Sequence, residues 1–359
     1  MGSGARNVTF AIPGDINCRT GGYIYDTHIL RLLPSLGMNV RHLELPSRFP
    51  RPLAADLTAA LRQFQTIPAD HILLADGLAF GALPESILSR ISQPMIALVH
   101  HPLGCETGLT EADRSLFFER ERTALRYAAH IIATSGATRR LLIEMFGVDG
   151  ANVSIAEPGT QKAARAVGSG GVTTLLAVGA VIPRKGYDIL VEALSAVKDL
   201  SWRLNIVGRL DQDRDCARRL LKLITYHDLD RRVEIMGELS EDRLERCYQT
   251  ADLFVMPSLF EGYGMALAEA MARGLPIIST RGGACDETVP DTAALKVDAG
   301  DAAQLHGALR AVIGIVGLRE KLAAGSMGAG SRLPGWSETA EKIAKCIAAN
   351  SLASNARAF

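Results

Sequence analysis

The first half of the chain alternates short apolar runs with longer stretches of helical periodicity. The apolar runs have the length of buried strands, and predict strands at residues 8–12, 40–45, 72–75, 95–100 and 131–134. Helices are predicted after Gly21-Gly22, at 53–64 and at 112–129. Such alternation is typical of a parallel sheet with helices on both faces.

The second half repeats this pattern after a break. Residues 158–172 have no apolar periodicity and are rich in Gly, Ala and Ser, which indicates a linker. Further strands are predicted at 174–178, 204–207, 233–236, 253–256, 276–279 and 294–297. The 359 residues are enough for about two domains. We therefore expect two Rossmann-like α/β domains, residues 1–165 and 171–336, followed by a helix at 337–359.

The amino-acid composition limits the kinds of binding partner that we expect for the protein. The 39 basic side chains equal the 39 acidic ones, so no global field attracts nucleic acid or an anionic membrane. At most peripheral membrane contact is expected. The six cysteines are scattered without metal-ligand spacing, which favours free thiols in the cytoplasm. No apolar run approaches the ~18 residues of a membrane span.

The most informative stretch runs from Pro257 to Ser279. It reads as a glycine loop after a strand, then a helix from Met265 and another strand. Gly262 and Gly264 would let the backbone approach a ligand, and the helix would direct free N–H groups at an anion such as phosphate.

Two carboxylates, Glu261 in this loop and Glu269 in the helix, could each grip a diol. A nucleotide sugar offers a sugar, a diphosphate and a ribose in a row. An isolated glutamate here would be an ordinary surface residue, but two of them flanking a Gly-Tyr-Gly loop favour a binding site.

This segment resembles the E-x7-E region of retaining family-4 glycosyltransferases, the group of glycogen synthases and phosphatidylinositol mannosyltransferases. The matching residues are Pro257-Ser258, Glu261-Gly262-Tyr263-Gly264, Glu269-Ala270 and Gly274-Leu275-Pro276. The resemblance extends over nearly the whole chain. It implies a GT-B fold, in which two Rossmann-like domains face each other across a cleft and the last helix crosses back to the N-terminal domain.

The resemblance also implies a phosphate clamp. The family has a basic residue after the first strand of the second half and then Lys-Gly, which Lys185-Gly186 match. Ala180 stands where the family has Arg. Lys185 is therefore expected to neutralise the diphosphate, with Arg184 or Arg209 compensating for the missing charge.

In the first half the same comparison points to His100, which ends a predicted strand and takes the position that contacts the donor sugar. His101 is the alternative. Asp76 ends the preceding strand and, like His101, is a weak candidate for the acceptor site. The remaining donor-site candidates are Gly21, Gly22, Gly208, Leu239, Tyr263 and Met265.

We therefore expect a retaining hexosyltransferase that uses a nucleoside diphosphate sugar, UDP-linked by preference or GDP-linked, and an acceptor such as a sugar, lipid-linked glycan or small molecule. The catalytic candidates are His100, Lys185 and Glu261. Asp211-Gln212-Asp213 matches a D-x-D metal motif only superficially, and no metal or cofactor is expected. The alternatives are a nucleotide-sugar 2-epimerase of the same fold and a catalytically silent sugar-nucleotide-binding partner.

Overall fold

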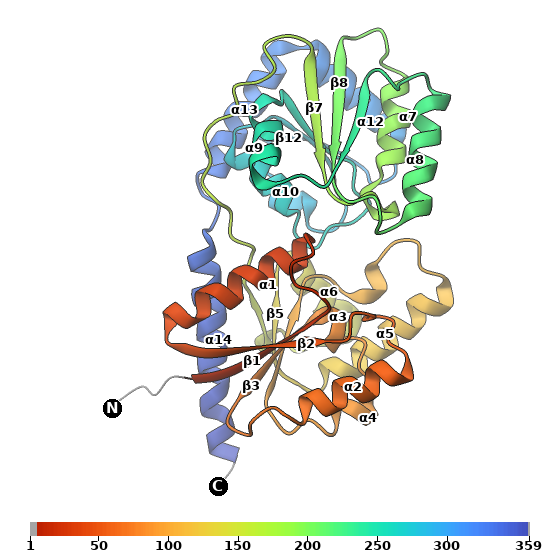
Figure 1. The fold of residues 1–359 in the computed structure, drawn as a ribbon. Coiled ribbons are helices and arrows are strands. Elements are labelled where there is room, and N and C mark those ends of the chain that lie inside the picture. Colours follow the sequence, from red (N-terminus) through yellow and green to blue (C-terminus); the bar gives the residue numbers. More distant parts are fainter. Residues whose placement is uncertain (1–5, 358–359) are drawn as a thin grey trace. The chain divides into compact units, whose positions relative to one another are not determined.

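The computed structural model describes residues 6–357, with the last side chains described at residue 350. Its contacts divide the chain into two compact units, Met1–Gly159 with Pro334–Phe359 (unit 1) and Thr160–Leu333 (unit 2). Each unit has one six-stranded parallel sheet with helices packed on it (Figure 1). The predicted α/β class with two Rossmann-like domains is confirmed. Residues 1–5 and 358–359 of the predicted domains lie outside the described residues.

The sheet of unit 1 has the strand order β2-β1-β3-β4-β5-β6. Its central strands β3 and β4 are buried at every residue and apolar apart from Asp76, as expected for strands covered on both faces, and β1 is buried from Val8 onward. The strands are β1 (Arg6–Pro13), β2 (Met38–Leu45), β3 (Ile72–Asp76), β4 (Met95–Val99), β5 (Ala128–Ala133) and β6 (Val153–Ile155). The α-helices are α1 (Gly21–Leu32), α2 (Ala54–Phe64), α3 (Gly77–Phe80), α4 (Glu85–Leu88), α5 (Glu111–Leu125), α6 (Gly136–Phe146) and α14 (Trp336–Arg357).

Helix α14 belongs to unit 1 although it follows unit 2 in the sequence (Figure 1). Its Ala340, Ile343 and Ile347 are fully buried in the same apolar cluster as strand β1. Trp336 stacks on His28 of α1 with ring centroids 4.0 Å apart. Apolar burial and one stacked ring pair thus attach the last helix to the first sheet.

The sheet of unit 2 has the order β12-β11-β10-β7-β8-β9. The strands are β7 (Thr173–Val178), β8 (Trp202–Val207), β9 (Val233–Gly237), β10 (Leu253–Met256), β11 (Ile277–Thr280) and β12 (Ala294–Val297). The α-helices are α7 (Tyr187–Ser195), α8 (Arg214–Tyr226), α9 (Glu241–Thr250), α10 (Met265–Ala272), α11 (Cys285–Thr288), α12 (Ala302–Gly314) and α13 (Val316–Gly330). Two apolar clusters, one containing Val255 and the other Phe254, include side chains from successive residues of β10.

One local prediction was wrong. The helix expected up to residue 129 ends at Leu125, and strand β5 already begins at Ala128. The boundary between the units falls inside the predicted linker, after Gly159. Part of this segment also pairs with unit 2, where the N–H groups of Val167 and Gly168 both donate to the Gln249 carbonyl. Backbone pairing of this kind leaves no apolar periodicity, so the sequence pattern did not reveal it.

Candidate functional site

Each sheet reverses its strand order once, and several predicted site residues lie in loops at or next to the reversal. In unit 1 the reversal lies between β1 and β3, and in unit 2 between β7 and β10. Ligands of open parallel sheets bind beyond the carboxyl ends of the strands at such points. The loops after β7 and β10 carry Lys185 and Glu261, and His100 follows β4, next to β3.

In unit 2, Glu261 lies between two cations. Its Oε1 is 2.6 Å from Lys185 Nζ, and its Oε2 is 3.1 Å from Arg184 Nη1. Ser258 Oγ also donates to Oε1 over 2.7 Å. The three charged side chains are only 9–15% exposed. We call Arg184, Lys185, Ser258 and Glu261 the Glu261 cluster.

The charges of this cluster depend on one another. Burial alone would raise the pKa of Glu261, but the charges of Lys185 and Arg184 and the bonds from Lys185 and Ser258 outweigh burial and lower the pKa to about 2. The carboxylate is therefore ionised at neutral pH and serves as the counter-ion of both cations. Any anion bound here would compete with Glu261 or share the cations with it.

The backbone around Glu261 is held by a second loop. Glu261 forms a parallel bridge with Gly283, and the Ala284 N–H donates to the Glu261 carbonyl over 2.8 Å. A Cβ at Gly283 would lie 2.3 Å from the Glu261 carbonyl oxygen, so only glycine allows this approach. The loop after β11 thus fixes the glutamate's backbone.

The second glutamate of the motif has a separate environment. Tyr248 Oη of α9 donates to Glu269 Oε2 over 2.7 Å. Burial raises the pKa of Glu269, against the hydrogen bond from Tyr248 and the charge of Arg273. Arg273 also lies 4.4 Å over the Tyr248 ring and pairs with Glu245. Tyr248 therefore orients the Glu269 carboxyl group.

The other predicted donor residues of unit 2 occupy the surrounding loops. Gly264 precedes α10 at φ 93°, and Gly262, Tyr263 and Met265 beside it are half-buried. Arg209 makes two hydrogen bonds to Asp211, at 2.9 and 3.0 Å.

Gly208 and Leu239, two further donor-site candidates, both contribute to the packing of unit 2. A Cβ at Gly208 would lie 1.9 Å from the Gly179 carbonyl oxygen, so this glycine permits two loops to pack. The side chain of Leu239 is 6% exposed and belongs to the apolar core.

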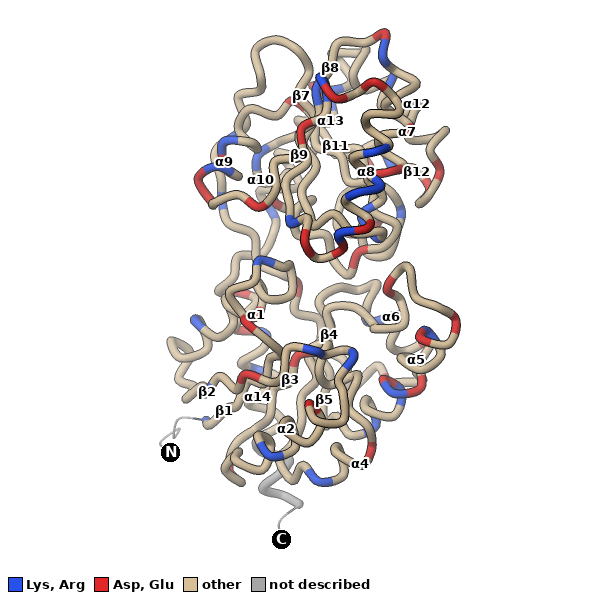
Figure 2. Tube along the Cα trace, turned by 45° about the vertical axis from the view of Figure 1, so that its right-hand side comes forward, with Lys and Arg blue, Asp and Glu red and all other residues tan. Residues whose placement is uncertain are grey.

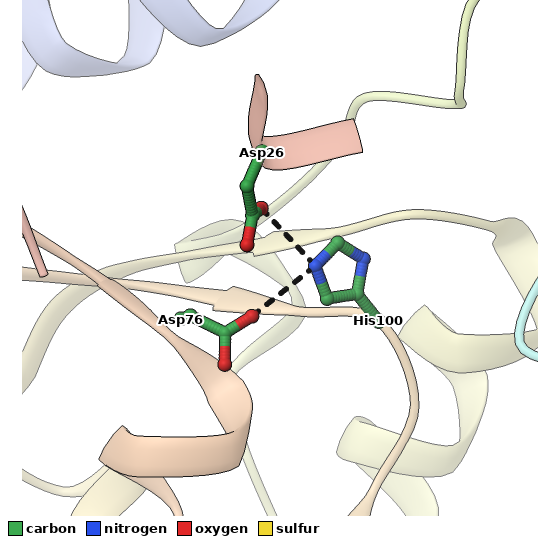
Figure 3. Close-up of side chains that lie close together, drawn as sticks. All are labelled: Asp26, Asp76 and His100. Carbon is green, nitrogen blue, oxygen red and sulfur yellow. Dashed lines mark hydrogen bonds and ion pairs between the residues drawn. The ribbon is translucent and has the colours of Figure 1, made fainter. Parts of the chain in front are cut away.

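In unit 1, His100 contacts two fully buried carboxylates (Figure 3). Its Nε2 lies 3.3 Å from Asp26 Oδ1 and 3.3 Å from Asp76 Oδ2. Burial would lower the pKa of His100, but the hydrogen bonds and charges of the two aspartates raise it to about 10. Asp76, a weak acceptor candidate in the sequence, is thus a direct partner of the histidine.

The neighbouring candidates of unit 1 are arranged around this histidine. Gly21 and Gly22 are the first two residues of α1, whose amino end is capped by Thr20. A Cβ at Gly22 would lie 3.3 Å from His100 Cδ2, so the glycine leaves room for the ring. His101 is directed elsewhere, with its Nε2 3.5 Å from Glu106 Oε2.

Two family models match the chain. Residues 17–159 match "Glycosyl transferase 4-like domain", and residues 172–314 match "Glycosyl transferases group 1". Together the two matches cover most of both units. The chain belongs to this glycosyltransferase family.

Two curated relatives of this chain are named as a glycosyltransferase and a mannosyltransferase. The D-inositol 3-phosphate glycosyltransferase of Pseudarthrobacter chlorophenolicus is 29% identical over 45% of the chain and 42% of its own length. The MMP alpha-(1->4)-mannosyltransferase of Mycolicibacterium hassiacum is 25% identical over 68% of the chain and 61% of its own length. The chain thus spans about half the length of these relatives.

Solved structures share the fold over nearly the full length. Sucrose-phosphate synthase from Thermosynechococcus elongatus has a TM-score of 0.84 at 20% identity, covering 97% of this chain and 100% of that one. Anabaena HepE in complex with UDP-glucose has a TM-score of 0.73 at 16% identity, covering 96% and 99%. The predicted GT-B fold is confirmed.

Sequence reasoning assigned no site role to four residues that hold predicted site residues: Asp26, Tyr248, Ser258 and Gly283. Gly282-Gly283 after a strand was a usable signal, because adjacent glycines often mark a tight approach. Ser258 lies in the stretch that matches the family motif, which was a second signal. Asp26 and Tyr248 have no such signal, because a lone Asp or Tyr in a helix reads as an ordinary residue until its partner is known.

Asp26, Asp76 and His100 are also the residue types that hold divalent cations, and one ligand atom of each lies within 4.8 Å of the others. The imidazole N–H between the two carboxylates accounts for the same arrangement without an ion.

Elsewhere, basic and acidic residues alternate over both units instead of collecting by sign (Figure 2). Among the helices of residues 6–357, none has the length and apolarity to cross a membrane.

Proposed function

We propose that this chain is a retaining hexosyltransferase that uses a nucleoside diphosphate sugar, with a UDP-sugar favoured and a GDP-sugar as the other choice. The acceptor would be a sugar, a lipid-linked glycan or a small molecule. The observation that carries this proposal is the Glu261 cluster, which gathers two cations at the sheet's reversal point beside the glycine loop before α10. A diphosphate is the ligand that such a site suits.

In the proposed reaction the bond between the sugar's anomeric carbon and the diphosphate breaks, and a bond to the acceptor oxygen forms on the same face. The acceptor's proton passes to the departing diphosphate. Lys185 and Arg184 offset the charge that develops on the leaving group. Glu261 and the amides of residues 262–264 position the sugar, and Glu269 holds the ribose. This scheme uses no protein nucleophile, metal or cofactor.

The solved complexes of the Anabaena relative with UDP and with UDP-glucose support the choice of donor class. A thermal-shift screen of nucleotide sugars, followed by release of nucleotide from the best binder, tests the proposal. A ligand that binds only the native state raises its melting temperature by mass action. Absence of a shift with every UDP- and GDP-sugar would contradict it.

A catalytically silent sugar-nucleotide-binding partner is the second candidate. Ala180 removes one cation from the predicted clamp, and Glu261 already pairs with the other two. Stabilisation by a donor without any turnover of labelled donor, across a panel of sugar and lipid acceptors, would favour this second function.

Replacing the ribose-binding candidate is expected to weaken donor binding specifically. Glu269→Ala should cost about 1.5–3 kcal/mol of nucleotide affinity, the range of a hydrogen bond to a charged group. Calorimetric titration with UDP measures it. Glu320→Ala, which removes an exposed carboxylate on α13, is the matched control and should leave affinity unchanged. Equal affinities for the Glu269 variant and the wild type would remove the ribose assignment.

A further inference from the structure

The environment of His100 is unusual because one ring nitrogen faces two carboxylates. Asp26 projects from α1 and Asp76 from the end of β3, and both are completely buried. Their oxygens lie at equal distances of 3.3 Å from Nε2. Only one hydrogen can sit on Nε2, so two acceptors compete for one donor.

Asp76 and the imidazole are held by further contacts. The second oxygen of Asp76, Oδ1, accepts the Leu78 N–H over 2.8 Å at the start of α3, which fixes that carboxylate. Tyr25 packs edge-on against the imidazole, with ring centroids 5.2 Å apart. The backbone carbonyl of His100 accepts the hydroxyl of Thr134, the residue after β5, over 3.0 Å. The ring therefore contacts side chains of α1 and β3, and Thr134 holds the backbone that carries it.

The charges demand at least one extra proton. Two buried carboxylates near each other repel, and an isolated buried anion is costly. An imidazolium at Nε2 offsets one of them. Burial and the charge of Asp76 raise the pKa of Asp26, against the opposing effect of His100, so Asp26 holds a proton more readily than an ordinary carboxyl group. Tyr23, which interacts with both carboxylates, has a raised pKa and stays neutral.

We propose that Asp26 and Asp76 are positioning residues for His100: together they hold the hydrogen on Nε2, fix the ring and keep it cationic, so that Nδ1–H is presented to a substrate at the carboxyl edge of the unit 1 sheet. Figure 3 shows Nδ1 on the side of the ring away from both carboxylates. The side chain retains 19% exposure, whereas the aspartates have none. This role in catalysis rests on the proposed function.

The proton and ring orientation can be measured without any substrate. In protein with ¹⁵N-labelled histidine, long-range ¹H–¹⁵N spectra distinguish imidazolium from either neutral tautomer, and His100→Gln identifies the signal. We expect His100 to be doubly protonated at pH 8, where an ordinary histidine is almost wholly neutral. A neutral ring at pH 8, or a signal that changes on dialysis against a chelator and returns with zinc, would overturn the proposal.

Variants test which groups hold the proton. Asp26→Asn and Asp76→Asn should each lower the pH at which His100 titrates by about one to three pH units. Asp70→Asn, an exposed aspartate of the same unit, is the control and should leave it unchanged. Titration of His100 at the wild-type pH in both buried-site variants would contradict the proposal, and thermal unfolding verifies that each variant is folded.

Turnover measured at two pH values then distinguishes a positioning role of Asp26 in catalysis from a purely structural role. Asp26→Asn should lose up to about tenfold in kcat at pH 8 and recover most of it at pH 6, below the lowered titration pH of His100. An equal loss of kcat at pH 6 and pH 8 would overturn the proposed role of Asp26 in catalysis. If the wild type turns over no donor, the proposed function fails, while the spectra still decide the state of His100.

Discussion

Lys185→Ala is expected to lower donor turnover by about 10²–10³-fold. Ala180 leaves the predicted clamp one cation short, so Lys185 and Arg184 must carry the charge of the departing diphosphate. Loss of a group that stabilises charge in the transition state costs roughly 2.7–4 kcal/mol of barrier, which is this rate factor. Single-turnover release of nucleotide from labelled donor measures it.

The Lys185→Ala variant also needs a measurement of its stability, because of where the lysine lies. Lys185 is not an exposed turn residue, because its side chain is 14% exposed and bound to Glu261. Urea unfolding of the variant is therefore needed beside the kinetics. Lys198→Ala removes an exposed lysine of the same unit and should leave both unchanged. Ala180→Arg added to Lys185→Ala should recover part of the rate. Near-wild-type turnover of Lys185→Ala would transfer the role to Arg184 or Arg209.

Glu261→Gln is expected to destabilise unit 2 by about 3–5 kcal/mol, because removing one member of a buried ion pair leaves uncompensated charge. Here two cations, Arg184 and Lys185, would lose their counter-ion. UDP should then raise the melting temperature more in this variant than in the wild type, since the diphosphate replaces the missing anion. Glu238→Gln, at an exposed carboxylate 3.9 Å from Arg209, is the control and should cost less than about 1 kcal/mol.

The pH dependence of stability supplies a second test of the ion pairs that Glu261 makes with Arg184 and Lys185. The folded-state pKa of Glu261 lies below its ordinary value of 4.5, at about 2. Its stabilising contribution is therefore complete above about pH 4.5 and is lost as the pH falls towards 2. The glutamine variant should lack this acid-dependent loss. Unfolding curves of the two proteins that stay parallel from pH 6 to pH 2.5 would show that Glu261 contributes no such linkage.

The alternation of apolar runs and helical segments was sufficient to predict both sheets, whereas the attachment of the final helix to unit 1 was predicted only from the family resemblance. Strand β6 was missed because its three residues, Val153–Ile155, are too short to stand out as an apolar run. The α5 boundary was misplaced because Ala128 and Ala129 suit a helix as well as a strand. Local composition cannot resolve such positions, since sheet pairing decides them.

Which loops carry the site residues could be predicted from the sequence, but the side-chain contacts between those residues could not. Glu261 and Lys185 were both predicted, yet their ion pair joins residues 76 positions apart. It forms because β10 lies beside β7 in the sheet, an order that no local pattern encodes. Asp26 was missed because a single aspartate in a helix normally faces solvent, and only the strand order brings it to His100.

The central claim is that Lys185 binds the diphosphate of a nucleotide sugar, and calorimetric titration of UDP and uridine, with GDP and guanosine in parallel, tests it most directly. The comparison isolates the phosphate contact from the base and ribose contacts. The account predicts that Lys185→Ala loses most of the affinity for the nucleoside diphosphate and keeps that for the nucleoside. Diphosphate affinity equal to that of the wild type in folded Lys185→Ala would contradict it.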